Sequence, residues 1–516
     1  MIRIRNIKVS LNSSLDKELS KLLKIKDFEY TLVKKSLDAR KKHISYIYTV
    51  DVNCSLNDVK RMNDNFTVAP KEEYKFNITG DKKQERRPVI VGAGPSGLFI
   101  AYLLSLNGYN PILIERGEDV DNRVKTIEEF WENNNLNVES NVQFGEGGAG
   151  TFSDGKLNTL VNDKEFRKKF VLETFVKFGA NEKIIYDAHP HIGTDVLRVV
   201  VKNMRNSIIE HGGSVRFNTK LTNINVSDNV LKSIEVNNSE IIECDSLFLC
   251  VGHSARDTFY MLNDVGIEMS SKSFAVGVRI IHNEADISKS MYGEAYKKLE
   301  PASYKLTYNT PEGRGVYSFC MCPGGYVVNA SSEKNRLCIN GMSNEKRNSG
   351  ASNSAIVVTV NKNDFGDSIF GGIEFQRKLE EKAYTLGNGL IPLQRFEDYS
   401  KNRVSDHIGR INAITKGKYS FANLNELFPE FINKSLKDGI NYFEGKIKGY
   451  SDPDSLVLGI EARTSSPIKM FRNDSLESNI KGIYPTGEGA GYAGGITTAA
   501  IDGIKQAENY VSIYRP

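Results

Sequence analysis

Cysteine, histidine and tryptophan are scarce in this 516-residue chain, which contains six, seven and one of them. Six irregularly spaced cysteines are too few for a disulfide framework and are typical of a reducing compartment. Neither sign of charge dominates, since 68 basic residues stand against 64 acidic ones, a net charge of +4. This nearly even balance of charge does not by itself indicate a nucleic-acid or membrane partner. No cysteine or histidine cluster has the spacing of a metal site, so we expect no metal.

Long hydrophobic runs are also missing. The first residues, MIRIRNIKVSLNSSLD, lack the apolar core of a signal peptide. The uncharged stretch 88–114 is interrupted at 92–97 by three glycines and a proline. It therefore predicts a strand, a turn and a helix rather than one membrane-spanning helix. We expect a cytoplasmic protein with no membrane partner, whose length suggests roughly three to four domains.

Residues 1–85 predict a small N-terminal α/β domain of ferredoxin-like type. The segment 2–10 alternates like a strand, and Ser14 is placed to cap a helix that carries a stripe of leucines. Two further strand-like segments follow at 28–35 and 43–52.

The N-terminal part is basic, and it ends in a polar segment. Residues 1–87 hold 20 Lys and Arg but only 12 Asp and Glu. A surplus of this size is more typical of a solvated face than of a nucleic-acid interface. The polar segment 80–87, GDKKQERR, has the composition of a linker.

The segment 88–117, PVIVGAGPSGLFIAYLLSLNGYNPILIERG, predicts a dinucleotide site. Gly92 permits a tight turn after a buried strand, Gly94 lets the backbone approach a pyrophosphate, and Gly97 lets the following helix pack closely. The helix N-terminus favours the phosphates. Glu115, at the end of the second strand, is placed to bind ribose hydroxyls. The other expected contacts of this motif are Pro95, Ser96 and Arg116.

Three distant segments favour FAD, bound non-covalently, over NAD. They are the glycine-rich segment 144–157, the strand and glycine at 245–257, and the strand, glycine turn and helix at 483–511. The last helix would point its positive end at the flavin ring, and Glu488 could bind ribityl hydroxyls. The expected FAD contacts in these segments are Gly147, Gly148, Gly150, Thr151, Gly252, Gly487, Glu488, Gly494, Gly495 and Ile496.

Long motifs throughout the chain resemble one bacterial family of uncharacterised FAD-dependent dehydrogenases, also described as NAD(FAD)-utilising dehydrogenases. Besides the 92–97 glycines, they are KSLDARKK at 35–42, FGEGGAGTFSDGKL at 144–157, HIGTD at 191–195, GHSARD at 252–257, FCMCPGG at 319–325, EARTSSP at 461–467 and GEGAGYAGG at 487–495. The resemblance implies a small N-terminal domain, a Rossmann-like FAD-binding domain and an inserted substrate domain, and it implies no particular substrate. Many flavoproteins with a single nucleotide-binding fold have Asp where this chain has Glu488.

The predicted fold class is therefore α/β, with an α+β insertion. We assign residues 1–85 to the N-terminal domain, 86–265 with 455–516 to a discontinuous FAD-binding domain, and 266–454 to the inserted substrate or cap domain. The sequence has no second G-x-G-x-x-G after a strand, so it has no dedicated nicotinamide domain. NAD(P)H could then act only as a transient electron donor. The redox-active Cys pair of disulfide reductases is also absent after the first Rossmann unit.

Four charged or titratable residues are candidates for catalysis, each with a structural alternative. Lys156 could stabilise reduced flavin or merely pin its loop. His191 could donate a proton, because imidazole titrates near neutrality, or be a hydrogen-bonded structural residue. His253 ends a strand directed at the cofactor, so it could act next to the cofactor or be a structural residue. Arg463 could hold an anionic substrate through its planar donor fork, or pair with Glu461 or another acid.

Cys320 and Cys322 form a separate candidate pair. On a regular strand, residues two apart share one face. Their α-carbons would lie about 6.6 Å apart, at the outer limit for a disulfide. A bend at Pro323-Gly324-Gly325 could carry both thiols to the flavin cleft, with Cys322 the more exposed. Buried, inert thiols are the alternative.

Together these patterns predict an FAD-dependent oxidoreductase that exchanges a hydride at flavin N5 with a small organic substrate. One alternative is a flavin enzyme acting on a tRNA base, for which the basic N-terminal part is the only indication. The other is a flavin-binding redox sensor or scaffold without turnover. The sequence does not indicate an oligomeric state.

Overall fold

A five-stranded parallel sheet is one of the two large sheets of the computed structural model, which describes residues 1–25, 27–40, 43–54, 65–159 and 161–516. The strand order is β25-β12-β6-β7-β8, the arrangement of a Rossmann-like dinucleotide-binding fold. All neighbouring strands run parallel. The strands are β6 (Val89–Val91), β7 (Ile112–Ile114), β8 (Ser214–Arg216), β12 (Leu247–Leu249) and β25 (Ile483–Pro485).

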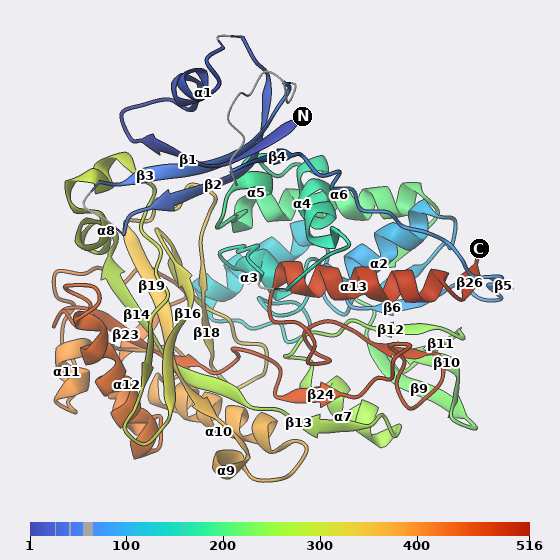
Figure 1. The fold of residues 1–516 in the computed structure, drawn as a ribbon. Coiled ribbons are helices and arrows are strands. Elements are labelled where there is room, and N and C mark those ends of the chain that lie inside the picture. The colour runs from blue at the N-terminus through green and yellow to red at the C-terminus, as the bar shows by residue number, and fades with distance from the viewer. Residues whose placement is uncertain (26, 41–42, 55–64, 160) are drawn as a thin grey trace.

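The two faces of this sheet bury alternate residues of each strand. Ile90 and Phe248 point into a layer of three helices, whereas Val89 and Leu247 point into a small antiparallel sheet. Figure 1 shows the helices on one side of the central strands and the small sheet on the other. The helices are α2 (Pro95–Leu106), α6 (Thr194–Glu210) and α13 (Ile496–Val511), and the strands are β9 (Leu221–Ser227), β10 (Val230–Val236) and β11 (Glu240–Glu243).

A seven-stranded mixed sheet forms the second large layer, shown beside the first in Figure 1. In sheet order its strands are β15 (Thr307–Asn309), β16 (Gly315–Cys322), β19 (Ala351–Val360), β14 (Phe274–Asn283), β23 (Leu456–Glu461), β20 (Ile391–Arg395) and β22 (Tyr419–Phe421). Val278 and Ile356 on one face join the core that contains α12 (Glu430–Glu444). The other face carries Arg279 and Glu461.

Two short paired strands mark where the chain enters and leaves this layer. β13 (Met269–Ser271) pairs antiparallel with β24 (Ile468–Met470). The sheet includes β23, so it extends seven residues beyond 454, where we predicted the insertion to end. A smaller three-stranded sheet, β18 (Ile339–Met342), β17 (Tyr326–Asn329) and β21 (Thr415–Lys416), packs against the inserted layer.

The N-terminal residues form a separate antiparallel sheet of order β2-β3-β1-β4. Ser14 caps α1 (Leu15–Leu23) as predicted, because its side chain accepts the Lys17 amide hydrogen. The strands are β1 (Ile2–Ser10), β2 (Tyr30–Asp38), β3 (Ser45–Val52) and β4 (Phe66–Val68). Residues 55–64 and the last two residues of the 35–42 motif lie outside the described residues, so the complete ferredoxin-like arrangement stays a prediction.

The segment from 69 to 87 is packed against the Rossmann part. Tyr74 and Phe76 join the core under α13, and the Tyr74 hydroxyl donates to Glu508 at 2.9 Å. β5 (Lys82–Lys83), inside the predicted linker, pairs with β26 (Tyr514–Arg515) at the C-terminus. The predicted linker is therefore tied to the body by backbone hydrogen bonds.

The remaining helices surround these sheets. None of the helices in the described ranges is long and apolar enough to cross a membrane. They are α3 (Val120–Asn133), the 3₁₀ turn Ala149–Phe152, α4 (Arg167–Lys177), α5 (Lys183–Tyr186), α7 (Arg256–Asp264), α8 (Glu284–Tyr292), the 3₁₀ turn Gly293–Lys298, α9 (Lys362–Phe365), α10 (Gly371–Leu386), α11 (Phe396–Ser400) and the 3₁₀ turn Leu424–Glu426.

Candidate functional site

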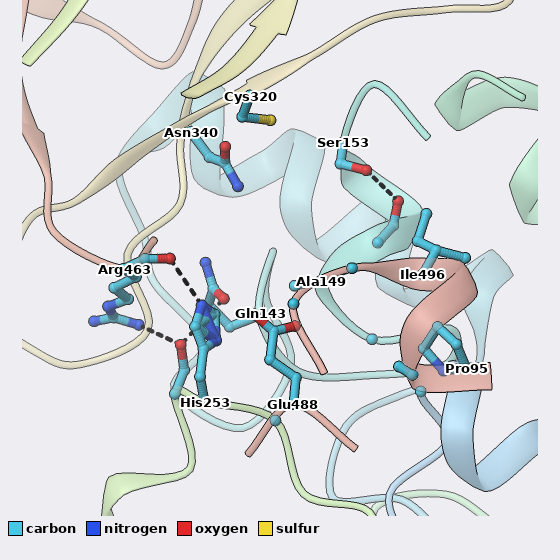
Figure 2. A pocket seen from close by; sticks show the side chains of 18 of the residues that line it. Pro95, Gln143, Ala149, Ser153, His253, Cys320, Asn340, Arg463, Glu488 and Ile496 are labelled. Carbon is cyan, nitrogen blue, oxygen red and sulfur yellow. Dashed lines mark hydrogen bonds between the residues drawn. The ribbon is translucent and has the colours of Figure 1, made fainter. Parts of the chain in front are cut away.

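A cavity of about 700 Å³ lies between the carboxyl ends of the parallel strands and the inserted sheet. One end is formed by the first glycine turn with Glu115, and the other by Cys320 with Asn340. Figure 2 shows Pro95 and Ile496 on one side of this space and Cys320 with Asn340 on another. Its volume is within the usual range of cofactor and small-ligand sites.

The first glycine turn has the backbone geometry that its sequence predicts. Gly92 has a φ of +104°, which L side chains rarely adopt. A Cβ at Gly97 would lie 2.0 Å from the carbonyl oxygen of Gly92, so only glycine permits this packing of helix on strand. A Cβ at Gly94 would meet no protein atom within 4 Å. Gly94 therefore opens onto the cavity, next to the N-terminus of α2.

Glu115 and Arg116 line the same end of the cavity. The buried Glu115 carboxylate accepts hydrogen bonds from the amides of Ala93, Gly117 and Gly145 at 2.8–3.0 Å. These three bonds leave part of its acceptor capacity for a ribose hydroxyl. Arg116 pairs with Glu139 and Asp257, and its guanidinium lies 4.2 Å from the Phe144 ring centroid.

The second glycine-rich segment contributes some residues to the cavity and others to its support. Gly148 and Gly150 line the cavity, but Gly147 and Thr151 pack behind it. A Cβ at Gly147 would lie 2.0 Å from the Thr151 hydroxyl, so these two residues support each other. Gly487 likewise packs against Ser96 rather than lining the cavity.

Glu488, Gly494, Gly495 and Ile496 bring the C-terminal segment to the cavity. α13 starts at Ile496 as expected, with Gly495 as its N-cap. Burial raises the pKa of Glu488 to about 7, and the charge of Lys272 offsets only part of this. Among the described residues, none donates a hydrogen bond to the Glu488 carboxyl.

These residues fit an FAD molecule. Cβ atoms at Gly94, Gly252 and Gly494 would all meet open space, so three separate backbone segments leave room for a ligand. Two helix N-termini border the cavity, where their free amides favour phosphate and other negative charge. Glu488 supplies a half-buried carboxyl with free acceptor positions for hydroxyl groups. The donors and acceptors thus follow the phosphate and polyol chemistry of FAD.

Lys156 lines the opposite end of the cavity beside a buried carboxylate. Its Nζ lies 3.8 Å from Asp154, which also receives the guanidinium of Arg347 at 2.7 Å. Burial opposes ionisation of Asp154, but these cations outweigh it and keep its pKa below the usual value. Because Asp154 is shared between two cations, Lys156 is available to a ligand anion.

The two candidate histidines occupy different environments. His191 is buried, and its ring nitrogens lie 3.0 Å from the carbonyl oxygens of Asp154 and Glu345. It is not among the residues that line the cavity, so the geometry supports the structural alternative. His253 does line the cavity, and its Nε2 bonds to the Arg463 carbonyl at 3.0 Å. Burial and nearby arginines lower the pKa of His253 to about 3, so it is neutral.

Arg463 is fully engaged within the protein. Its fork binds both carboxylate oxygens of Glu380 at 2.8 and 2.9 Å, not Glu461. Arg256 binds the same carboxylate at 2.8 Å to each oxygen. This Arg256–Glu380–Arg463 triad is buried. The geometry therefore supports the structural alternative, in which Arg463 pairs with another acid, here Glu380.

The two cysteines do not share one strand face. Cys320 has a φ of +41° and sits in a bulge of β16, where the register to β19 shifts between Phe319 and Cys322. Cys320 lines the cavity, whereas Cys322 is fully buried and donates to the Cys320 carbonyl at 3.3 Å. The prediction that Cys322 is the more exposed thiol is wrong, because the bulge precedes the Pro-Gly-Gly bend and turns Cys320 outward.

Arg279, Glu461 and Asn340 complete the site and were not singled out by the sequence. Arg279 donates to Glu461 at 2.9 Å, to Asn340 at 3.2 Å and to the Cys320 carbonyl at 3.1 Å. Burial raises the pKa of Glu461 to about 7 although Arg279 opposes this. Glu461 is the first residue of the EARTSSP motif, and this position is the one sequence feature that could have identified it. No group of three or more His, Cys, Asp or Glu in the described ranges could hold a metal.

Fold and cavity together define the class of this protein as a Rossmann-like FAD-binding fold with additional domains. Residues 273–464 match the family model described as FAD-dependent protein, C-terminal domain-like, and residues 90–148 match an NAD(P)-binding Rossmann-like domain. Residues 1–53 match a domain of unknown function.

A protein of Clostridium beijerinckii described as uncharacterized is 46% identical to this chain over 527 residues. The match covers 99% of this chain and 98% of that protein. The chain belongs to the same family of FAD-dependent proteins, the one its motifs indicated.

Solved structures give weaker similarities. The glycerol-3-phosphate dehydrogenase from Bacillus halodurans, complexed with FAD, aligns with a TM-score of 0.37 and 10% identity over 85% of this chain and 67% of that one. A geranylgeranyl bacteriochlorophyll reductase-like protein from Thermoplasma acidophilum aligns with a TM-score of 0.35 and 11% identity over 83% and 78%. TM-scores this low carry no argument about the chemistry of this chain.

Proposed function

We propose that the protein is an FAD-dependent oxidoreductase that exchanges a hydride with a small organic substrate. The single observation that supports this is the continuous cavity, which joins the glycine turns to a polar end with Lys156, Cys320 and Asn340. The first part has the chemistry to hold a dinucleotide, and the second has reactive and charged side chains. A scaffold that only bound flavin would not need this second part.

Each part of the cavity would have a defined task. The α2 N-terminus and Gly94 would hold the pyrophosphate, Glu115 a ribose, and Glu488 the ribityl chain. Bound FAD would supply hydride chemistry at its N5 atom. Lys156 would hold an anionic group of the substrate. Glu461, with a pKa near neutrality, could take up or release a proton.

NAD(P)H is proposed only as a transient donor. Because the sequence has no second G-x-G-x-x-G motif after a strand, the donor would use the same cavity and leave before the acceptor enters. Steady-state kinetics should then be ping-pong, with parallel double-reciprocal lines. Intersecting lines with a stable ternary complex would contradict this order.

The cofactor assignment is tested by Gly94→Ala. The added methyl group meets no protein atom within 4 Å, so folding should be unaffected while FAD loses its space. The matched control is Gly445→Ala at the end of α12, where the nearest atom lies at 3.5 Å. We expect at least a tenfold rise in the FAD dissociation constant for Gly94→Ala alone, equivalent to about 1.4 kcal/mol.

Catalysis is tested separately by stopped-flow absorbance of bound flavin with a panel of donors and acceptors. Reduction of the bound flavin by one reagent and its reoxidation by another would support the oxidoreductase. Lys156→Met should slow the reaction of the flavin with anionic substrates more than with neutral ones. A protein that binds FAD but is turned over by none of them would favour the sensor alternative. A protein that cannot be loaded with FAD would refute the proposed function.

A further inference from the structure

We propose that Cys320 and Cys322 form a redox-active dithiol that reduces small disulfides carrying carboxylate groups, with Cys320 as the nucleophile. This inference deepens the proposed function and rests on it for the supply of electrons. It assigns a substrate class to the polar end of the cavity. Figure 2 shows the Cys320 sulfur in this region, close to Asn340.

The bulge in β16 gives Cys320 access to the cavity. Phe319 pairs with Ala355 and Cys322 with Asn353, so Cys320 and Met321 together oppose one residue of β19. A non-glycine residue at φ +41° is uncommon and is found mostly where the surroundings fix it. Here the Arg279 guanidinium fixes it by donating to the Cys320 carbonyl.

The second thiol is placed to complete an exchange reaction. Cys322 is buried directly behind Cys320, and its Sγ turns back towards the Cys320 carbonyl at 3.3 Å. In a thiol–disulfide exchange, an attacking thiolate needs access and a resolving thiol needs only proximity. Cys320 satisfies the first requirement and Cys322 the second.

Electrostatics separate the two thiols in the same sense. A hydrogen bond between the two side chains, with Cys322 as donor to the Cys320 sulfur, acts together with the charges of Lys156 and Arg279. These lower the pKa of Cys320 despite its burial and the opposing charge of Asp154. The same hydrogen bond and burial raise the pKa of Cys322. Cys320 is therefore the thiolate, and Cys322 keeps its proton until it reacts.

The reaction balances within the protein and its substrate. The Cys320 thiolate attacks R–S–S–R, a bond forms between Cys320 and one sulfur, and R–S⁻ leaves. Cys322 then loses its proton and attacks the Cys320 sulfur, which releases the second R–S⁻ and forms a Cys320–Cys322 disulfide. The dithiol has lost two electrons and the substrate has gained them. Reduced FAD, when bound, would supply the pair that restores the dithiol.

The positive charge around the thiols favours a substrate that carries carboxylate groups. Lys156 and Arg347 share the single carboxylate of Asp154. Lys305 also lines the cavity, and within the described ranges it has no ion-pair partner. Glu461 is already paired with Arg279. This end of the cavity thus carries more positive than negative charge and favours an anionic disulfide.

The test uses the full-length reduced protein in a Cys54→Ser background, with 5,5′-dithiobis(2-nitrobenzoate) as the probe. This disulfide carries two carboxylates, and each exchange releases a coloured thiolate. We expect two thiolates per protein in a fast phase, and peptide mass mapping should find a Cys320–Cys322 disulfide. Cys322→Ser should release one and retain a stable mixed disulfide on Cys320, whereas Cys320→Ser should lose the fast phase.

Two controls separate this result from general thiol reactivity. Cys244→Ser should leave the fast phase unchanged, because burial raises the pKa of Cys244 to about 12. For each probe, the reaction rate of the protein is divided by that of free cysteine. This ratio should be smaller for the uncharged probe 2,2′-dithiodipyridine than for the carboxylated probe. Lys156→Met should reduce the preference for the carboxylated probe about tenfold. A mixed disulfide that persists on Cys320 with Cys322 intact would overturn the dithiol.

The flavin spectrum of the same sample separates failure of this inference from failure of the proposed function. If the protein holds FAD and both thiols stay unreactive, the dithiol is refuted and the proposed function is unaffected. If the thiols exchange rapidly in a protein that cannot be loaded with FAD, the proposed function fails, and with it the supply of electrons for turnover.

Discussion

The buried triad Arg256–Glu380–Arg463 predicts a large loss of stability in Glu380→Gln. The Glu380 carboxylate accepts four hydrogen bonds of 2.8–2.9 Å, two from each guanidinium. Arg256 lies in α7 beside the Rossmann sheet, and Glu380 lies in α10 of the insertion. Removing one charge from a buried ionic group costs about 3–5 kcal/mol. Since Arg256 keeps Glu333 and Arg463 keeps two serines, we expect about 3 kcal/mol.

The single tryptophan provides the assay. Trp131 in α3 is buried and donates to the Asn329 carbonyl of β17 at 2.9 Å, so its fluorescence reports contact between α3 and the three-stranded sheet of the insertion. Urea unfolding should show the loss for Glu380→Gln. Glu381→Gln is the matched control, because the neighbouring Glu381 is half exposed and pairs with Arg336 at the surface. That pair should contribute less than about 1 kcal/mol.

The pH dependence of the difference gives a second check. Burial opposes ionisation of Glu380, but Arg256 and Arg463 outweigh it and hold the pKa of this carboxyl well below its usual range. Its contribution is therefore present above the ordinary glutamate pKa and is lost as pH falls below it. The gap between wild type and Glu380→Gln should narrow in acid. Equal unfolding energies for Glu380→Gln and Glu381→Gln at pH 7 would refute the reasoning.

Three further predictions concern the cofactor end and the N-terminal part. Gly97→Ala should destabilise the fold itself, seen as a lower melting temperature, because its Cβ would lie 2.0 Å from the Gly92 carbonyl oxygen; unchanged melting would contradict the packing. FAD-free protein should lose stability as pH rises from about 4.5 through 7, since burial raises the folded-state pKa of Glu488 to about 7. Glu488→Gln should reduce the difference in melting temperature between pH 5 and pH 8. An equal difference in the two proteins would contradict the assignment. A chain starting at residue 70 should keep bound flavin and melt higher than one starting at 86, which lacks Tyr74 and Phe76; these side chains are partly buried against the core, so each contributes less than a fully buried one, which is worth about 1.5–3 kcal/mol. Equal melting would show that the segment is dispensable.

The Rossmann unit could be predicted almost residue by residue, because its glycine spacing leaves the backbone little choice. The predicted strand, turn and helix at 88–106 correspond to β6 and α2. The same holds for α13 beginning beside Gly495. Residues close together in the sequence determine these elements, so the local sequence was enough to predict them.

Features that depend on distant partners could not be predicted. The partner of Arg463 is Glu380, 83 residues away, and nothing in EARTSSP specifies it. The bulge at Cys320 could not be predicted, because no glycine marks the position with positive φ. A regular strand was therefore predicted, and it places both thiols on one face. The polar composition of 80–87 suggested a linker, although neighbouring aromatic residues and the C-terminal strand hold the segment in place.

The pairing of β13 with β24 has a consequence for how such a protein can be rebuilt. Ser271 and Ile468 are opposite each other in an antiparallel pair, so the two ends of the whole insertion meet about 5 Å apart. A short hairpin turn could close the chain there and leave the five-stranded core with its glycine turns uninterrupted. The same junction could accept a different insertion, which would then face the same cofactor pocket. The chain thus connects the two parts at a single pair of strands, and a replacement insertion would have to provide its own partner for Arg256 in place of Glu380.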